Sequence, residues 1–463
     1  MTNLCVLLSS CLILIPHPSS LIPLPSYLFP VPYTDAMIRK LALLAAMEVL
    51  AMPALAATNI ESAAARVESS VIATRRDLHE HPELGNREAR TAKIVADRLR
   101  ALNIEVTEKV AHTGVIGILK GGKPGKVVAL RADMDALPVT EQVDLPFASK
   151  VRTTYNGQEV GVMHACGHDA HVAILLGVAE VLAGMRSELP GTVKFIFQPA
   201  EEGAPQGEEG GAGLMVREGA LENPKVDSIF GLHVTSRFAV GEIAYRPEGM
   251  MAAVDSFRIV VRGKQTHGAY PWLGVDPIVV ASQIVLGLQT IPSRQLDSTL
   301  APSIVTVGAI HGGVRNNIIP DEVEMIGTIR SLDAKMREEL HARIKRTAES
   351  IATSGGATAT VTITTGYPIT YNDPALTEAS APSLRRAAGN ANVRVVNAVL
   401  GAEDFSFFQQ KVPGLFFWLG TRPKNQTAEE APSNHSPLFY VDESGLGLGV
   451  KAMVQVTVDY LSH

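Results

Sequence analysis

The stretch VMHACGHDAH at residues 162–171 concentrates one cysteine and several histidines in a short segment. Such a cluster can be a metal site, a nucleophile or a buried polar turn. Cys166 and His168 are two residues apart, so in an extended segment their side chains point the same way and can share one metal cluster. A cysteine that binds metal does so as a thiolate, which can bridge two cations. One thiol and one imidazole do not complete a metal site, so further ligands must come from elsewhere in the chain.

Residues of metal-binding type recur at four other places, each at or after the end of a predicted strand. They are Asp133 and Asp135 after KVVALR, Glu201 and Glu202 after TVKFIFQPA, His233 in SIFGLHV, and His435 in NHSPLF beyond GLFFWLGT. Taken singly, each is as readily explained as a turn, cap or packing residue. Ligands in open α/β sheets gather at the carboxyl ends of the strands. If these strands are parallel neighbours, we expect the side chains to converge with Cys166 and His168 in one crevice.

The adjacent pair Glu201 and Glu202 suits the activation of water by a metal. Neighbouring side chains usually point in different directions, so one carboxylate can bind metal while the other faces the water to be activated. Metal binding lowers the pKa of water from about 15.7 toward about 7. A positioned carboxylate then takes the proton and returns it to the leaving amine, which typically contributes about 10²–10⁴-fold in rate.

The elements that must position these residues indicate an α/β fold. Residues 60–103 are predicted to be helical. After them come four apolar segments typical of strands, at 115–121, 126–133, 192–198 and 228–234. Segments with the residue spacing of a helix lie among them, at 171–185 and 213–221. This alternation is typical of a mainly parallel sheet buried on both faces. From about residue 250 the order becomes β-α-β-β-α-β, which is typical of a ferredoxin-like α+β unit.

The length of 463 residues exceeds one ordinary core, so two domains are expected. We predict a catalytic metal-binding domain at 58–250 and 367–463, and an inserted lid or dimerisation domain at 251–366. The hydrophobic content of 46% and charged content of 19% are those of a globular protein. The net charge of −6 and the lack of a basic stripe argue against a nucleic-acid partner.

Residues 1–57 predict a presequence that contains a signal peptide. Arg39 and Lys40 precede an apolar run at 41–52, and Ala54-Leu55-Ala56 is an A-x-A cleavage site. The run is too short to span a membrane. We therefore expect translation to start at Met37 and a periplasmic or secreted protein to begin near Ala57, without a membrane segment; the alternative is one long presequence.

Removal of this segment would also remove Cys5 and Cys11 and leave Cys166 as the single cysteine. One cysteine cannot form an internal disulfide. An exposed thiol is a liability in an oxidising compartment, so the pattern favours a protected or metal-bound role for Cys166.

Seven motifs in order resemble the M20 metallopeptidase superfamily, and more narrowly its amidohydrolase branch. That branch contains hippurate hydrolases, N-acyl-amino-acid amidohydrolases and indole-3-acetyl-amino-acid hydrolases. The motifs run from about residue 70 to the C-terminus: DLHEHPELGNRE, LRADMDALPV, MHACGHDAH, FQPAEEG, GLHV, GKQTHGAYPWLGVDP, and GAEDF with NHSPLF.

The resemblance implies a role for each matching residue. The metal ligands are Cys166, His168, Glu202, His233 and His435. Glu201 is implied as general base and acid, and Asp135 as a residue that supports the metal site. His267 is implied as the residue that polarises the scissile carbonyl, supplied by the partner subunit in dimeric relatives. Asn317 is implied as a second substrate-contacting residue.

The sequence departs from the broader superfamily at two positions. Asp133 stands where the peptidases usually have a metal-binding histidine, and Cys166 where they have a bridging aspartate, as is normal for the amidohydrolase branch. The resemblance implies two divalent metal ions per subunit. A mixture of thiolate, imidazole and carboxylate suits zinc but also manganese, nickel or cobalt.

From these residues we expect a homodimeric metal-dependent amidohydrolase. It would cleave the amide bond between an acyl or aroyl group and an amino acid. Like carboxypeptidases and aminoacylases it would act on C–N bonds, here bonds other than ordinary peptide bonds. A dipeptidase or aminopeptidase is the close alternative, although no group that would recognise a free α-amine is evident. A binding protein on an inactive scaffold is a further alternative, but such scaffolds usually lose the base or a ligand, and both are present in this chain.

Overall fold

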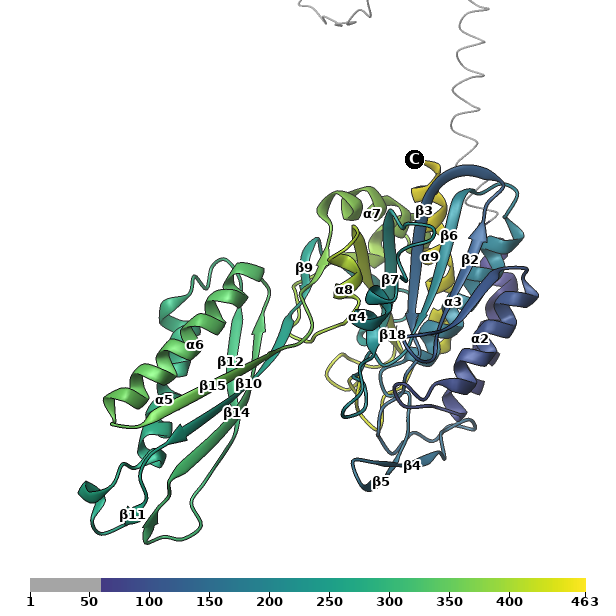
Figure 1. Cartoon of the computed structure of the whole chain (residues 1–463). Helices are drawn as coiled ribbons and strands as arrows, with labels where there is room; N and C mark the ends of the chain where they lie inside the picture. The colour runs from purple at the N-terminus through teal and green to yellow at the C-terminus, as the bar shows by residue number, and fades with distance from the viewer. Residues whose placement is uncertain (1–59) are drawn as a thin grey trace, which may run out of the picture. The chain divides into compact units, whose positions relative to one another are not determined.

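The computed structural model of the chain describes residues 60–463 (Figure 1). The predicted signal peptide, the Met37 start and the mature N-terminus near Ala57 lie outside the described residues. Residues 60–80 are helical and α2 spans Ala89–Ala101, so the single helix expected over 60–103 is interrupted. Pro82 explains the break, because proline lacks an N–H group and disfavours helical geometry in the preceding residue.

The central sheet has eight strands in the order β1-β2-β6-β3-β7-β18-β8-β17. Its four middle strands, β6, β3, β7 and β18, are parallel neighbours, which confirms the expected mainly parallel sheet. β2, by contrast, pairs antiparallel with both β1 and β6. The strands are β1 (Glu105–Val110), β2 (Gly114–Lys120), β3 (Lys123–Asp133), β6 (Pro190–Gln198), β7 (Ser228–Ala239), β8 (Ile243–Tyr245), β17 (Val393–Val395) and β18 (Gly414–Arg422).

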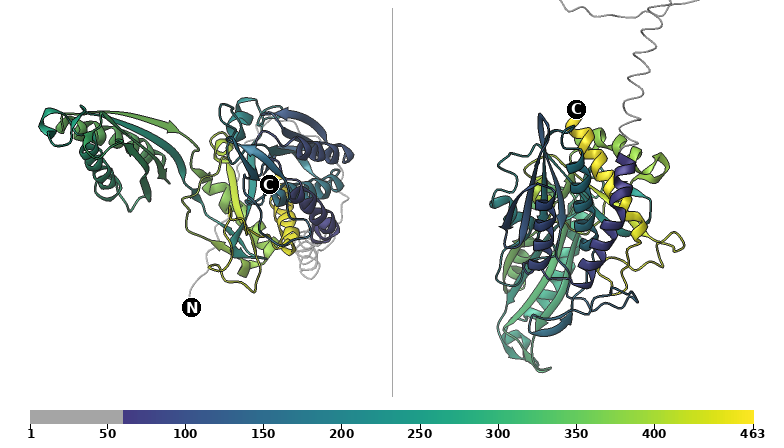
Figure 2. Two further views of the ribbon diagram at one scale, coloured as in Figure 1. Left: turned by 90° about the horizontal axis from the view of Figure 1, so that it is seen from below. Right: turned by 90° about the vertical axis from the view of Figure 1, so that its right-hand side faces the viewer.

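Both faces of this sheet are buried. One face packs in a single apolar cluster against the helix at 60–80 and against α2, α3 (His168–Gly184), α7 (Pro374–Ala388) and α9 (Leu446–Ser462). The other face packs against the short helices α4 (Gly211–Arg217) and α8 (Ser406–Gln409). Both views in Figure 2 show α9, in yellow, beside the purple helix at 60–80, which an ion pair between Lys451 and Glu61 also joins. Burial on both faces explains why these strands read as continuous apolar runs.

A second sheet has the order β12-β14-β10-β15 and is entirely antiparallel. Its elements follow the predicted β-α-β-β-α-β order: β10 (Ala253–Arg262), α5 (Pro277–Thr290), β12 (Ser303–Gly312), β14 (Glu322–Ser331), α6 (Ala334–Ser354) and β15 (Thr358–Thr365). One apolar cluster joins the two helices to the sheet. Both helices begin where the sequence supplies an acceptor, because the carboxylates of Asp276 and Asp333 accept backbone N–H bonds of the first turn.

Three short strand pairs complete the described chain: β4 (Arg152–Tyr155) with β5 (Gln158–Gly161), β9 (Glu248–Met251) with β16 (Thr370–Asn372), and β11 (Thr266–His267) with β13 (Ile318–Ile319). The 3-10 turns are Pro271–Leu273, Asn390–Asn392 and Glu443–Gly445, and a π turn covers Ile291–Gln295. Among residues 60–463, no helix has the length and hydropathy needed to cross a membrane.

Candidate metal centre

The order of the four parallel strands places the candidate ligands together. β3 ends at Asp133, β6 ends three residues before Glu201, β7 contains His233, and the chain after β18 returns with His435. Because the strands are parallel, these segments meet at one edge of the sheet. β7 continues past His233 to Ala239, so this strand is longer than the sequence pattern suggested.

The loop before α3 brings the cysteine to this edge. Gly167 has φ +90°, and a Cβ atom there would lie 2.3 Å from a methyl group of Val234, so only glycine fits. Cys166 precedes it and His168 begins α3. The Sγ atom of Cys166 lies 3.3 Å from Nε2 of His233. The side-chain amide of Asn434 donates to the backbone oxygens of Cys166 and Val234, at 3.1 and 3.2 Å, and holds the loop against β7.

The segment Ala200–Glu202 is held by side chains from three other parts of the chain. The N–H of Ala200, which has φ +51°, donates to the carboxylate of Glu88 at 2.9 Å. The N–H of Glu202 donates to Asp135 at 3.0 Å. The hydroxyl of Tyr367 donates to the backbone oxygen of Glu201 at 2.6 Å. These contacts fix the directions in which the two adjacent carboxylates point.

The five predicted ligands come together in overlapping groups. Within each group the candidate ligand atoms lie within 4.8 Å of one another: Cys166, His168 and His233 form one group, Cys166, Glu202 and His435 another, and His168, Glu201 and Glu202 a third. In the second group, Nε2 of His435 lies 3.0 Å from Oε1 of Glu202. Cys166 belongs to two groups, which is the arrangement that a bridging thiolate requires.

Hydrogen bonds on the far side of two imidazoles leave a ring nitrogen free to bind metal. Nδ1 of His233 donates to the carbonyl of Val234 at 2.7 Å, so Nε2 faces Cys166 with a lone pair. Nδ1 of His168 lies 3.3 Å from Asp135, while its buried Nε2 has no hydrogen-bond partner within residues 60–463. Buried polar atoms rarely remain unsatisfied. A carboxylate or carbonyl behind a histidine is also the usual support of a metal ligand, so these residues fit a bound cation.

His171 lies in the same cluster but has no free nitrogen. Its Nε2 accepts the N–H of Val234 at 2.9 Å, so the ring proton is on Nδ1, which lies 2.5 Å from Asp133. Asp133 also accepts from Arg131 at 2.7 Å. Asp133 and His171 are therefore engaged with other protein groups, and they support the five candidate ligands without being ligands themselves.

The charges around the cluster shift several pKa values. Burial, followed by the charges of Glu403 and Glu202, raises the pKa of Glu201 well above its usual range. Burial and the nearby His171 lower the pKa of His233 well below its usual range, which favours the neutral imidazole that a metal needs. Hydrogen bonds to Cys166 and Glu202 raise the pKa of His435 to about 10.

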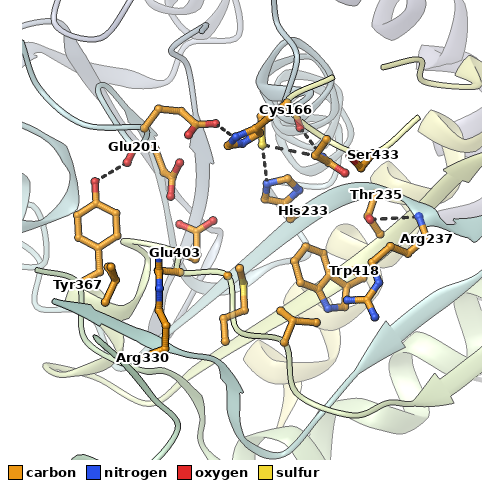
Figure 3. A pocket seen from close by; sticks show the side chains of 18 residues that line it. Cys166, Glu201, His233, Thr235, Arg237, Arg330, Tyr367, Glu403, Trp418 and Ser433 are labelled. Atoms are coloured by element: carbon orange, nitrogen blue, oxygen red, sulfur yellow. Dashed lines mark hydrogen bonds and ion pairs between the residues drawn. The ribbon is translucent and has the colours of Figure 1, made fainter. Parts of the chain in front are cut away.

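The cluster opens into a pocket of about 550 Å³, drawn in Figure 3. The lining includes the candidate base and four of the candidate ligands: Glu201, Glu202, Cys166, His233 and His435. Residues that the sequence did not single out complete the wall: Thr235, Arg237, Met251, Val254, Arg330, Tyr367, Val399, Gly401, Ala402, Glu403, Trp418, Ser433 and Asn434. Four of these residues belong to recognised motifs, Gly401, Ala402 and Glu403 to GAEDF and Asn434 to NHSPLF. Of these, Glu403 could have been proposed from its motif.

His267 and Asn317 do not line this pocket. His267 lies in β11, where its exposed ring accepts the N–H of Ala269 at 3.0 Å. The N–H of Gly268 donates to the backbone oxygen of Asn317 at 2.8 Å, so the two predicted substrate-contacting residues are close to each other. The structure of one chain therefore joins them to each other but not to the candidate ligands.

The fold and the site define a metal-dependent hydrolase of the α/β class. The model of peptidase family M20/M25/M40 matches residues 129–459, and the chain belongs to this family, in its amidohydrolase branch.

Relatives across most of the chain have hydrolase names. Thermostable carboxypeptidase 2 of Saccharolobus solfataricus is 44% identical over 85% of this chain and 96% of its own length. N-acetylcysteine deacetylase of Bacillus subtilis is 40% identical over 84% of this chain and 96% of its own. IAA-amino acid hydrolase ILR1-like 4 of Arabidopsis thaliana is 39% identical over 84% of this chain and 86% of its own length.

A similar solved structure is the Bacillus subtilis YXEP protein, described as a dinuclear metal-binding peptidase of the M20 family. It is 37% identical, with a TM-score of 0.71, and the match covers 86% of this chain and 99% of that one.

Proposed function

We propose that this protein hydrolyses the amide bond of N-acyl or N-aroyl amino acids, releasing a carboxylic acid and an amino acid. The observation that carries the proposal is the position of Glu201, a buried carboxyl group within 4.8 Å of candidate ligand atoms of His168 and Glu202, facing the pocket. A general base must lie within reach of the water that it deprotonates. The names of the relatives that remove acetyl or indole-acetyl groups from amino acids support this choice of substrate.

Two divalent ions would be held by five side chains, Cys166, His168, Glu202, His233 and His435. Zinc, manganese, nickel and cobalt all suit this mixed set. When bound, such ions lower the pKa of water and polarise a carbonyl group. In this chain Asp135 orients His168, and the carbonyl of Val234 orients His233.

Glu201 would move the proton. Its buried carboxylate would accept a proton from the attacking water and donate it to the nitrogen of the leaving amino acid. Two hydrogen bonds would hold Glu201 in place. The Tyr367 hydroxyl donates to its backbone oxygen, and the backbone N–H of Asp404 lies 3.4 Å from its carboxylate oxygen Oε1. His267 and Asn317 would contact the carbonyl and the rest of the substrate, as the resemblance implies.

Arg330 is the candidate anchor for the carboxylate of the amino acid. It lies on β14, is half-buried, lines the pocket, and forms no ion pair among the described residues. Burial lowers its pKa, so its charge is incompletely solvated and would gain from a bound carboxylate. Met251, Val399 and Trp418 offer apolar surface to an acyl group.

Peptide hydrolysis at a free C-terminus is the second candidate, because the 44% identical relative is named a carboxypeptidase. Arg330 would serve a peptide's terminal carboxylate equally well. The two candidates differ in whether the group on the other side of the scissile amide is an acyl group or an amino acid.

We also propose a homodimer. β12 is an edge strand with unpaired backbone groups, and it exposes Ile304 and Ile310. α5 exposes Val279 and Leu286. Exposed apolar side chains beside an open edge favour association with a second copy, which could also supply His267. Sedimentation at several concentrations tests this proposal, and a monomer at micromolar concentration would contradict it.

Export to the periplasm or the medium remains a proposal based on the sequence of residues 37–57. N-terminal sequencing of the exported protein tests it. A mature chain that begins near Ala57 is expected, and a mature chain that retains Leu4 or Cys5 would contradict it.

The test of function compares N-benzoylglycine and N-acetyl amino acids with simple dipeptides and peptides with a free C-terminus. Bound metal is first removed from the protein, and separate samples are then loaded with each of the candidate metals. We expect release of the amino acid from the acylated substrates, with loss of activity in excess chelator. Equal rates with and without chelator, or cleavage of peptides alone, would overturn the proposal.

A further inference from the structure

Arg237 lines the pocket, and its guanidinium group forms no ion pair with any other residue in the range 60–463. It lines the same pocket as Cys166 and His233, yet its side chain is exposed. A surface arginine without a partner is ordinary, so its place in the wall of the pocket needs a separate explanation.

An irregularity of the central sheet places Arg237 there. β7 and β18 are paired at Thr235 with Gly420 and again at Ala239 with Arg422, so β7 has two extra residues between these pairs. Arg237 is at the middle of this bulge, and its N–H donates to the hydroxyl of Thr235 at 3.3 Å. Bulges beside active sites re-aim a side chain, and this one follows closely after the candidate ligand His233 on the same strand.

In Figure 3 the two arginines lie on different sides of the pocket. Arg330 is drawn at the lower left, below Glu403, and Arg237 at the right, beyond Trp418, with Cys166 and His233 above both in this view. If Arg330 holds the carboxylate of the amino acid, a substrate whose amide lies at the cluster extends its acyl group toward Arg237. Trp418, which is largely buried, would contact the carbon chain along the way.

We propose that Arg237 forms a subsite for an anionic acyl group, so that the preferred substrates are N-acyl amino acids whose acyl chain ends in a second carboxylate. This inference rests on the proposed function and narrows its substrate class. Water adds across the C–N bond as before, and the products are a dicarboxylic acid and an amino acid. The planar guanidinium group can bind the terminal carboxylate through two parallel hydrogen bonds, which a neutral acyl chain cannot make.

The experiment uses two substrates that differ at the end of the acyl chain, where one has a carboxylate and the other an alkyl group. N-succinyl-L-leucine and N-pentanoyl-L-leucine have acyl chains of similar length, and their kcat/KM values are compared on the metal-loaded, full-length protein. We expect the ratio to favour the succinyl compound about tenfold, as the paired hydrogen bonds between an exposed guanidinium group and a carboxylate would give. The ratio should fall to about one in Arg237→Met and recover in part in Arg237→Lys.

A matched control separates a specific contact from the general electrostatic field. Arg246 has a half-buried side chain that donates to the backbone oxygen of Gly249 at 3.0 Å, and it does not line this pocket. Arg246→Met changes the net charge by the same amount, and it should leave the substrate ratio as in the wild type. A ratio that falls equally in both variants would overturn the role of Arg237.

The remaining outcomes are also decisive. A wild-type ratio near one, or a ratio that survives in Arg237→Met, would reject the subsite. If Arg237→Met instead removes a preference for N-acetylglutamate over N-acetylglutamine, the anion belongs to the amino acid and the acyl assignment is wrong. If neither leucine compound is hydrolysed, the proposed function fails. Calorimetric binding of the same two compounds to the metal-loaded protein then decides the role of Arg237 independently of turnover.

Discussion

The Sγ atom of Cys166 lies 3.3 Å from Nε2 of His233, although the two residues are 67 positions apart in the sequence. The contact exists because the loop before α3 crosses the carboxyl half of β7, where Gly167 allows close approach to Val234. Burial and the charge of Glu202 raise the pKa of the Cys166 thiol. A thiol in such a place ionises only with a cation beside it, as metal coordination provides.

Cys166→Ser should therefore lose metal. A serine hydroxyl is far less acidic than a thiol, and loss of a direct ligand should cost more than the 10–100-fold in affinity that is typical of a supporting residue. Metal content after dialysis against a weak chelator measures this. His311→Ala, which removes an exposed histidine of β12, is the control and should keep full metal occupancy. Full occupancy of Cys166→Ser would mean that Cys166 only packs.

Glu201→Gln should retain metal and lose turnover. The amide keeps the size of the side chain but cannot accept the proton of water, so we expect kcat to fall by about 10²–10⁴-fold. Elemental analysis and steady-state kinetics on the same preparation separate the two effects. Glu208→Gln is a suitable control, because Glu208 follows in the same loop but pairs with Arg87 outside the pocket. Turnover close to the wild-type value would show that the base is another residue.

Tyr367→Phe should lower kcat and leave KM and metal content unchanged. The substitution removes only the hydroxyl that donates to the backbone oxygen of Glu201 at 2.6 Å. A hydrogen bond of this kind contributes about 1 kcal/mol, so a fall of about fivefold in kcat is expected.

The control for Tyr367 is Phe407→Leu. The ring of Phe407 packs edge-on against that of Tyr367, with centroids 6.0 Å apart. Its truncation should lower thermal stability and leave the hydroxyl contact in place. Equal losses of kcat in the two variants would indicate that Tyr367 acts through packing alone.

Asp255→Asn should destabilise the protein at neutral pH but not in acid. Arg337 and His341 donate to this buried carboxylate at 2.8 and 2.6 Å, and the N–H of Gly366 donates at 2.9 Å. Burial raises the pKa of Asp255, but these partners outweigh it and hold the pKa below the usual value. We expect the free energy of unfolding to fall by on the order of 2 kcal/mol. This is less than for a fully buried ion pair, because Arg337 and His341 keep some contact with water.

The direction of the pH effect follows from the lowered pKa. The folded state binds the Asp255 proton less readily than the unfolded state, so the stabilisation is complete above the unfolded value of about 3.9 and is lost as the pH falls through the folded value. Urea unfolding of the wild type and Asp255→Asn at pH 7, 5 and 3 measures the difference in their free energies of unfolding. A difference that persists undiminished at the lowest pH would show that Asp255 acts through its shape and not its charge.

The sequence predicted the identity of the candidate ligands better than their surroundings. The alternation of apolar runs and helices indicated a parallel sheet, and the motifs indicated Cys166, His168 and Glu202 before any contact was known. It did not indicate that His171 has both ring nitrogens engaged, because the N–H of Val234 comes from a strand 63 positions away. The break at Pro82 was also missed, because helical periodicity on both sides of a short interruption reads as one helix.

The sequence alone determined which chemical groups are present and which strands they follow, because side-chain type and apolar periodicity are local properties. Only the tertiary structure decided that β6, β3, β7 and β18 are neighbours in that order and that Arg237, Arg330 and Tyr367 join one pocket. Strand order and the direction of a bulge depend on packing between segments hundreds of residues apart. No local pattern encodes that packing, so the wall of the pocket, and with it the choice of substrate, became visible only in the folded chain.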